Sequence, residues 1–149
     1  MKKDTNSHIF LTIILSVVTI PAVFSAVQLA HAQQTLDIAT VGGNETFGGE
    51  KIGSVTIVPN EHIINIIANM SLPTTEGKVF EGWLVDAGGS DFKLSLGEFA
   101  KTGALEYTAT MVNPYTYTQF VVTEEPFEDP DPNAAAPVAG AELKTPFGQ

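Results

Sequence analysis

The sequence predicts an all-β domain with an immunoglobulin-like or sandwich-type fold, built from about seven or eight strands behind an N-terminal signal or anchor segment. Two observations favour this class. Short runs of β-branched and aromatic residues recur at near-regular spacing, and Gly, Pro or Asn turns separate them. No stretch after residue 32 shows a convincing helical period. Residues 33–149 are therefore expected to form one small β domain.

Residues 1–32 have the pattern of a signal peptide. Lys2 and Lys3 precede a long apolar run without a charge, and Ala30 and Ala32 flank a single residue in the small-x-small pattern that signal peptidase accepts. This predicts cleavage after Ala32 and a secreted protein. The alternative is an uncleaved membrane anchor, because the apolar run is long enough to span a bilayer. In both cases residues 33–149 lie outside the cytoplasm.

The composition of residues 33–149 limits what the domain can bind. Removing Lys2, Lys3 and Asp4 from the seven basic and seventeen acidic residues leaves five lysines and sixteen acids, a net charge of −11. The chain has no arginine, so nucleic acid and anionic membrane surfaces are not expected partners. It also has no cysteine, which excludes structural disulfides, thiolate zinc sites and thiol nucleophiles. Any membrane contact is expected only through an uncleaved N-terminal segment.

Three strands are expected in the first half of the domain. Residues 35–41 form a short run closed by a glycine pair, and residues 54–58 form a second run that ends at Pro59-Asn60. Residues 63–72 are the most apolar stretch, with a fully apolar face and a mixed one, and they stop at Pro73.

Four more strands are expected at residues 78–86, 92–99, 104–112 and 119–124. The first of these holds the only tryptophan, which offers the largest single burial in the chain. The expected core residues of the domain are Ile64, Ile66, Trp83, Leu84, Leu96 and Phe99.

The C-terminal part changes character. Residues 124–133 are acidic and proline-rich, so they predict a stiff loop rather than a central strand. Residues 134–143 are small and predict a return as an edge strand. Residues 144–149 are expected to be frayed.

Three motifs in this order resemble one family. Leu72-Pro73 precedes Phe80-Glu81-Gly82-Trp83-Leu84-Val85-Asp86, then Leu96-Gly97-Glu98-Phe99 follows, and Val121-Val122-Thr123-Glu124-Glu125-Pro126 leads into the proline-rich loop. Together they resemble the extracytoplasmic C-terminal domain of anti-sigma-K factor-type regulators. The resemblance spans nearly the whole of residues 33–149, and it implies a sandwich-like β domain on the sensor side of such a regulator.

The resemblance does not extend to sigma-factor binding. In the full regulators a cytoplasmic helical domain, often with a His/Cys zinc motif, holds the sigma factor. Here residues 1–8 alone precede the apolar run, and cysteine is absent. The expected function is a non-enzymatic extracytoplasmic binding or sensing module for a protein partner or an envelope ligand, without a cofactor. A structural protein of the cell envelope or surface is the alternative, and a secreted hydrolase is a third and weaker one.

Two groups of residues are candidate binding sites. Tyr115, Tyr117 and Phe120 follow a proline break and are candidate ligand or partner contacts. The acidic loop supplies oxygen ligands suited to calcium, although it lacks the residue order of an EF-hand, so a solvated loop remains the alternative. Its candidate ligands are Glu124, Glu125, Glu128, Asp129 and Asp131. No catalytic residue is predicted, because His62 has no identifiable nucleophile or metal partner.

Overall fold

A computed structural model describes residues 33–144 of the chain, except residues 61 and 112. The predicted signal or anchor segment, with Ala30 and Ala32, lies outside the described residues, and so do residues 145–149. No helix among the described residues is long and apolar enough to cross a membrane.

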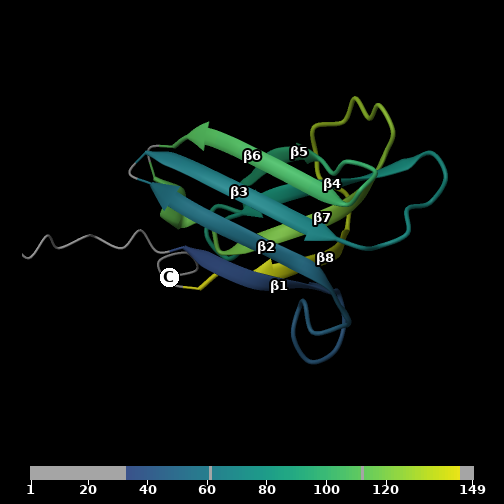
Figure 1. The fold of residues 1–149 in the computed structure, drawn as a ribbon, viewed down its shortest axis with the longest axis horizontal. Coiled ribbons are helices and arrows are strands. Elements are labelled where there is room, and N and C mark those ends of the chain that lie inside the picture. The colour runs from purple at the N-terminus through teal and green to yellow at the C-terminus, as the bar shows by residue number, and fades with distance from the viewer. Residues whose placement is uncertain (1–32, 61, 112, 145–149) are drawn as a thin grey trace, which may run out of the picture.

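Eight strands and one short 3₁₀ helix make up the described chain. Their bounds are β1 Gln34–Thr40, β2 Lys51–Asn60, β3 Ile63–Met70, β4 Lys78–Val85, β5 Lys93–Glu98, β6 Ala104–Thr110, η1 Pro114–Thr116, β7 Gln119–Pro126 and β8 Pro137–Glu142. The strands form one antiparallel sheet in the order β5-β4-β7-β8-β1-β2-β3-β6. The two edge strands, β5 and β6, approach one another, so the sheet curls into a nearly closed barrel (Figure 1). The predicted all-β class and the expected number of strands are confirmed.

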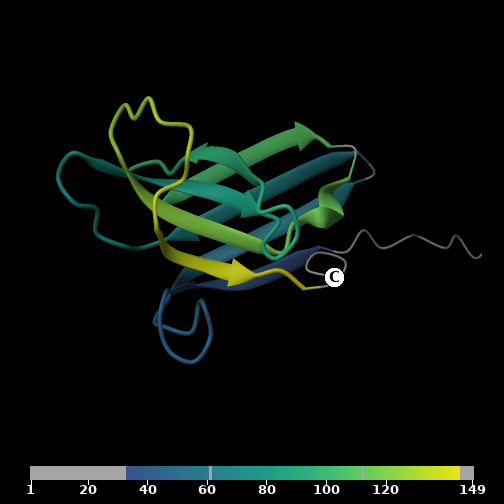
Figure 2. The ribbon, with the colours of Figure 1, turned by 180° about the vertical axis from the view of Figure 1, so that it is seen from behind.

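The barrel has two distinct ends (Figures 1 and 2). At the terminal end, β1 begins and β8 ends, beside the β4–β5 turn and the 111–118 segment that contains η1. The β2–β3 connection also lies at the terminal end. The distal end holds the other four connections, which are residues 41–50, 71–77, 99–103 and 127–136. Among the described residues, the strands and both buried clusters fall within residues 34–143, so segment 33–149 contains the described core.

The main core fills the inside of the barrel. Alternate residues of every strand point inward, as the period of a β-strand requires. Five of the six expected core residues lie in this cluster: Ile64, Ile66, Leu84, Leu96 and Phe99. Their exposed fractions range from 0% to 7%, so the prediction of a core at these positions is confirmed.

Trp83 is buried as predicted, but it belongs to a second cluster on the outer face of the sheet. It packs with Val85, Val121 and Phe47, and Ala134 covers the cluster. Phe47 comes from the 41–50 loop, and Ala134 comes from the 127–136 loop, which crosses over β4 and β7 in Figure 2. These strands are thus covered on both faces, which fits their consecutive apolar residues Trp83-Leu84-Val85 and Phe120-Val121-Val122.

The prediction of an edge strand at residues 134–143 is wrong in its position. Strand β8 forms there, but it lies between β7 and β1 in the interior of the sheet. Its small residues fit this place, because a Cβ on Gly140 would collide with the carbonyl oxygen of Phe120 and lie 2.6 Å from the ring of Phe47. The expectation of a frayed end is also wrong for residue 144, because the backbone N–H of Lys144 donates to Oε1 of Gln34 at 2.9 Å.

Candidate functional site

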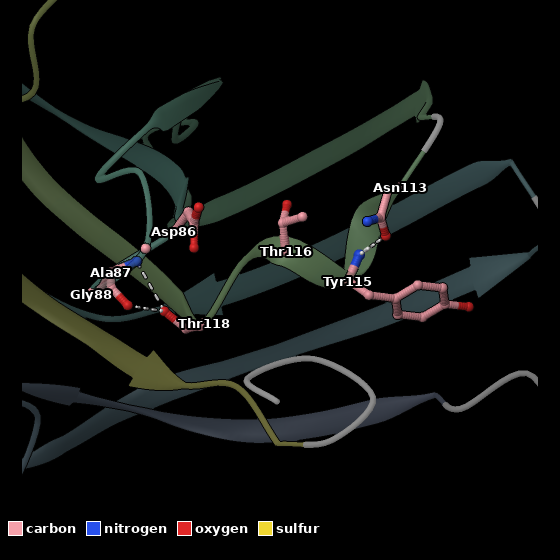
Figure 3. Close-up of a pocket in the computed structure, with 8 residues that line it drawn as sticks. Asp86, Ala87, Gly88, Asn113, Tyr115, Thr116 and Thr118 are labelled. Atoms are coloured by element: carbon pink, nitrogen blue, oxygen red, sulfur yellow. Dashed lines mark hydrogen bonds between the residues drawn. The ribbon is translucent and has the colours of Figure 1, made fainter.

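An open cleft of about 460 Å³ lies at the terminal end of the barrel (Figure 3). One wall is the β4–β5 turn, and the other is the segment that leads into β7. The lining residues are Asp86, Ala87, Gly88, Gly89, Asn113, Tyr115, Thr116 and Thr118. The lining is mainly polar, with one carboxylate, one amide and several hydroxyls.

Asp86 fixes the shape of the first wall. Its Oδ2 accepts hydrogen bonds from the hydroxyl of Ser90 at 2.7 Å and from the backbone N–H of Ser90 at 3.0 Å. These two bonds lower the pKa of Asp86, the hydroxyl bond most. Gly89 lies against this carboxylate, and a Cβ there would collide with it. The turn therefore presents a carboxylate that stays ionised at neutral pH.

Thr118 ties the second wall to the first. Its Oγ1 accepts a hydrogen bond from the N–H of Ala87 at 3.0 Å (Figure 3). Its own N–H donates to the carbonyl of Val85 at 2.9 Å. Asn113 orders the start of η1, because its Oδ1 accepts from the N–H of Tyr115 at 3.1 Å. The cleft thus has walls that are held by hydrogen bonds before any ligand binds.

The three predicted aromatic contacts lie in different environments. Tyr115 lines the cleft and is 38% exposed, although its ring points away from the Asp86 turn in Figure 3. Tyr117 is half-buried against the main core, and burial, followed by the charges of Tyr107 and Asp86, raises its pKa. Phe120 is fully buried on the inner face of β7, so the prediction that it contacts a ligand at the surface is wrong.

Glu124 and Glu125, the first two predicted calcium ligands, bind backbone amides at separate places. Oε1 of Glu124 accepts from the N–H of Thr75 at 2.8 Å, and this bond is the main cause of the lowered pKa of Glu124. Glu125 is 5% exposed, and its Oε1 accepts from the N–H of Ala135 at 2.8 Å. Adjacent residues of a strand point to opposite faces, so the two carboxylates diverge.

Two of the remaining three acids, Asp129 and Asp131, hold the loop by local hydrogen bonds. Oδ1 of Asp129 accepts from the N–H of Asp131 at 2.9 Å, and Oδ1 of Asp131 accepts from the N–H of Asn133 at 3.0 Å. Glu128 is exposed and has a φ of 60°. Within the described ranges, no group of three or more His, Asp or Glu side chains is placed to hold a metal ion. The structure does not bring the five predicted ligands together.

His62 lies at the terminal end, in the β2–β3 connection, and is exposed. Its carbonyl accepts from the N–H of Met111 at 2.6 Å. Over the part of the chain that the structure describes, no hydrogen bond joins its ring to a serine or a carboxylate. The geometry therefore gives no support to a nucleophile–base pair at this histidine.

Sequence reasoning missed most of the cleft. The Gly88-Gly89 turn and the proline break at residue 114 were readable as turns, yet nothing local in the sequence shows that the two segments face each other. The two segments face each other because β4 pairs with β7, which places Val85 opposite Gln119.

Comparisons with known proteins found no relationship. No family model matches the sequence, no curated protein matches it, and no solved structure matches the fold.

Proposed function

We propose that residues 33–149 form a non-enzymatic extracytoplasmic binding or sensing module, and that its ligand site is the cleft at the terminal end. The observation that carries the proposal is the ordered polar lining around Asp86, Asn113 and Thr116. Preformed concave sites with a few fixed polar groups are typical of ligand binding.

The chemistry of the lining favours a hydroxyl-rich ligand. A carboxylate accepts hydrogen bonds from vicinal hydroxyl groups, and hydroxyl and amide side chains both donate to them and accept from them. The open shape suits part of a longer chain better than a small enclosed molecule. A saccharide of the cell envelope fits these properties, and a peptide loop of a protein partner would use the same groups.

The resemblance to the sensor-side domain of anti-sigma-K factor-type regulators supports the same function class. It rests on the three motifs, which form the β3–β4 region, β5 and β7. With it we propose the finer immunoglobulin-like or sandwich-type relationship, in which β5-β4-β7 and β1-β2-β3-β6 face each other across the main core. Binding of a sigma factor is not part of the proposal.

The alternative of a structural envelope protein would use exposed strand edges for assembly. Strands β5 and β6 are the edges of the sheet, but both are short and carry exposed charges at Lys93, Glu98 and Glu106. Charges on short edges oppose edge-to-edge pairing. The geometry therefore favours the binding module.

Titration of ¹⁵N-labelled segment 33–149 with chitotetraose, mannotetraose and maltotetraose tests the proposal by NMR. We expect shift changes at the amides of Gly88, Gly89 and Thr116 for at least one of these sugars. Thr116→Val removes a lining hydroxyl and should weaken binding several-fold. The control variant Thr110→Val, at an exposed residue of β6, should leave binding unchanged.

If none of the three saccharides changes the chemical shifts of the cleft amides, the result counts against a saccharide site. Concentration-dependent self-association of the same sample in sedimentation would then favour the structural alternative. Saccharide hydrolysis that is lost in His62→Ala would instead favour the hydrolase.

A further inference from the structure

A second cavity, of about 310 Å³, lies at the distal end of the barrel. It sits between the end of β3, the start of β4 and the 99–103 turn. Its apolar wall includes Met70, Leu72, Phe80 and Phe99, and two lysines, Lys78 and Lys101, also line it. The two phenylalanines are at most 7% exposed, whereas Lys101 is exposed. The cavity thus has an apolar floor, with Lys101 toward solvent and Lys78 half-buried. Lys78 also lies near the Glu124 carboxylate and helps to lower its pKa.

Backbone contacts fix the walls of this cavity. The N–H of Phe99 donates to the carbonyl of Phe80 at 2.8 Å, and the N–H of Met70 donates to the carbonyl of Gly103 at 2.8 Å. Gly103 has a φ of +82°, and a Cβ there would collide with the carbonyl oxygen of Met70. The 99–103 turn is therefore held close against the end of β3, so the cavity exists without a ligand.

Positive charges such as those of Lys78 and Lys101 are rare in this domain. Residues 33–149 have only five lysines and no arginine, against sixteen acids. Two of the five cations line this one cavity, beside its apolar floor. An amphiphile with an anionic head complements this arrangement, because its tail contacts the floor while its head lies near the ammonium groups.

We propose that the distal cavity binds a free single-chain amphiphile with a carboxylate head, of the fatty-acid class. The head pairs with Lys78 and Lys101, and the tail packs against Phe80 and Phe99. A lipid held in a bilayer is disfavoured, because the domain has a net charge of −11 and repels an anionic membrane surface. This site is separate from the terminal-end cleft and does not depend on the function proposed for it.

NMR titration of ¹⁵N-labelled segment 33–149 with octanoate and decanoate, below their micellar concentrations, tests the proposal. We expect shift changes at the amides of Leu72, Val79 and Gly103, and affinity about fourfold higher for each added methylene. The double variant Lys78→Gln/Lys101→Gln should bind decanoate about fivefold more weakly, as expected for two partly exposed ion pairs.

The matched control is Lys93→Gln/Lys144→Gln, which removes the same charge from two exposed lysines at the terminal end and should bind decanoate like the unmodified segment. Equal losses in the two double variants would overturn the proposal, and so would equal affinity for decyltrimethylammonium. Shift changes that map to the terminal-end cleft, or binding to anionic vesicles without binding to decanoate, would also overturn it. Inorganic phosphate should cause no comparable shifts, because it has no tail.

Discussion

At the scale of single residues, one buried hydrogen bond connects the second cluster to the sheet. Nε1 of Trp83 donates to Oγ1 of Thr123 at 2.8 Å, and both residues are buried. An indole N–H that is buried without an acceptor loses its hydration and gains nothing in return. The threonine hydroxyl therefore determines whether the tryptophan can be buried here.

We predict that Thr123→Val lowers the free energy of unfolding by about 1–3 kcal/mol, because it leaves the indole N–H unpaired in a site of the same volume. Urea unfolding of segment 33–149 measures the change. A double-mutant cycle with Trp83→Phe provides the control, since the threonine substitution should cost less once the donor is gone. Equal costs of Thr123→Val in both backgrounds would show that the hydrogen bond does not contribute.

The sequence allowed the burial of Trp83 to be predicted, but not the partner of its N–H. Burial follows from the size and apolarity of the side chain. The partner follows from the pairing of β4 with β7, which aligns Trp83 with Val121 and brings Thr123 near. Such pairing depends on the whole sheet, and no local pattern encodes it.

At the scale of elements, the β4–β5 turn depends on the ionised form of Asp86. Its pKa is lowered by the hydroxyl and the N–H of Ser90, so the folded state favours the carboxylate. A depressed pKa gives stability that is present above the unfolded value, near about 4, and is lost as the pH falls through the folded value. The turn, and with it one wall of the cleft, should therefore loosen in acid.

We predict that Ser90→Ala raises the pKa of Asp86 toward its ordinary value, because it removes the hydroxyl hydrogen bond that lowers this pKa most. Carboxyl ¹³C chemical shifts followed through a pH titration measure this change. Ser54→Ala, at a distance in β2, is the control and should leave the curve of Asp86 unchanged. An unaltered pKa in Ser90→Ala would mean that the hydroxyl bond does not hold the carboxylate.

The positions of the strands in the sequence were easier to predict than which strands lie next to one another in the sheet. The expected run at residues 35–41 corresponds to β1 at Gln34–Thr40, and the run at 119–124 corresponds to β7 at Gln119–Pro126. The small residues of β8 were interpreted as an edge strand. They are in fact small because Phe47 and the backbone of β7 lie against them, and both are remote in the sequence. The cleft was missed for the same reason, since its two walls meet only after β4 and β7 have paired.

At the scale of the whole molecule, β8 joins two groups of strands that otherwise have no shared ladder. It pairs with β7 on one side and with β1 on the other, so it links β5-β4-β7 to β1-β2-β3-β6. It also contributes Ala139 and Ala141 to the main core, and Leu143 follows directly. The last strand in the sequence is therefore central to the closure of the barrel.

We predict that truncation after Ala136 abolishes cooperative unfolding of segment 33–149. It exposes the ladder edges of β7 and β1 and removes buried side chains, a loss comparable with the roughly 5–15 kcal/mol that stabilises a typical domain. Thermal unfolding followed by circular dichroism measures the outcome.

Truncation after Lys144 is the matched control, because it retains β8 and the Gln34–Lys144 hydrogen bond, and it should unfold cooperatively. Addition of a peptide of residues 137–149 should restore the transition in the shorter form by filling the gap between β7 and β1. A cooperative transition at an unchanged temperature without β8 would show that the two groups of strands hold together through the core alone.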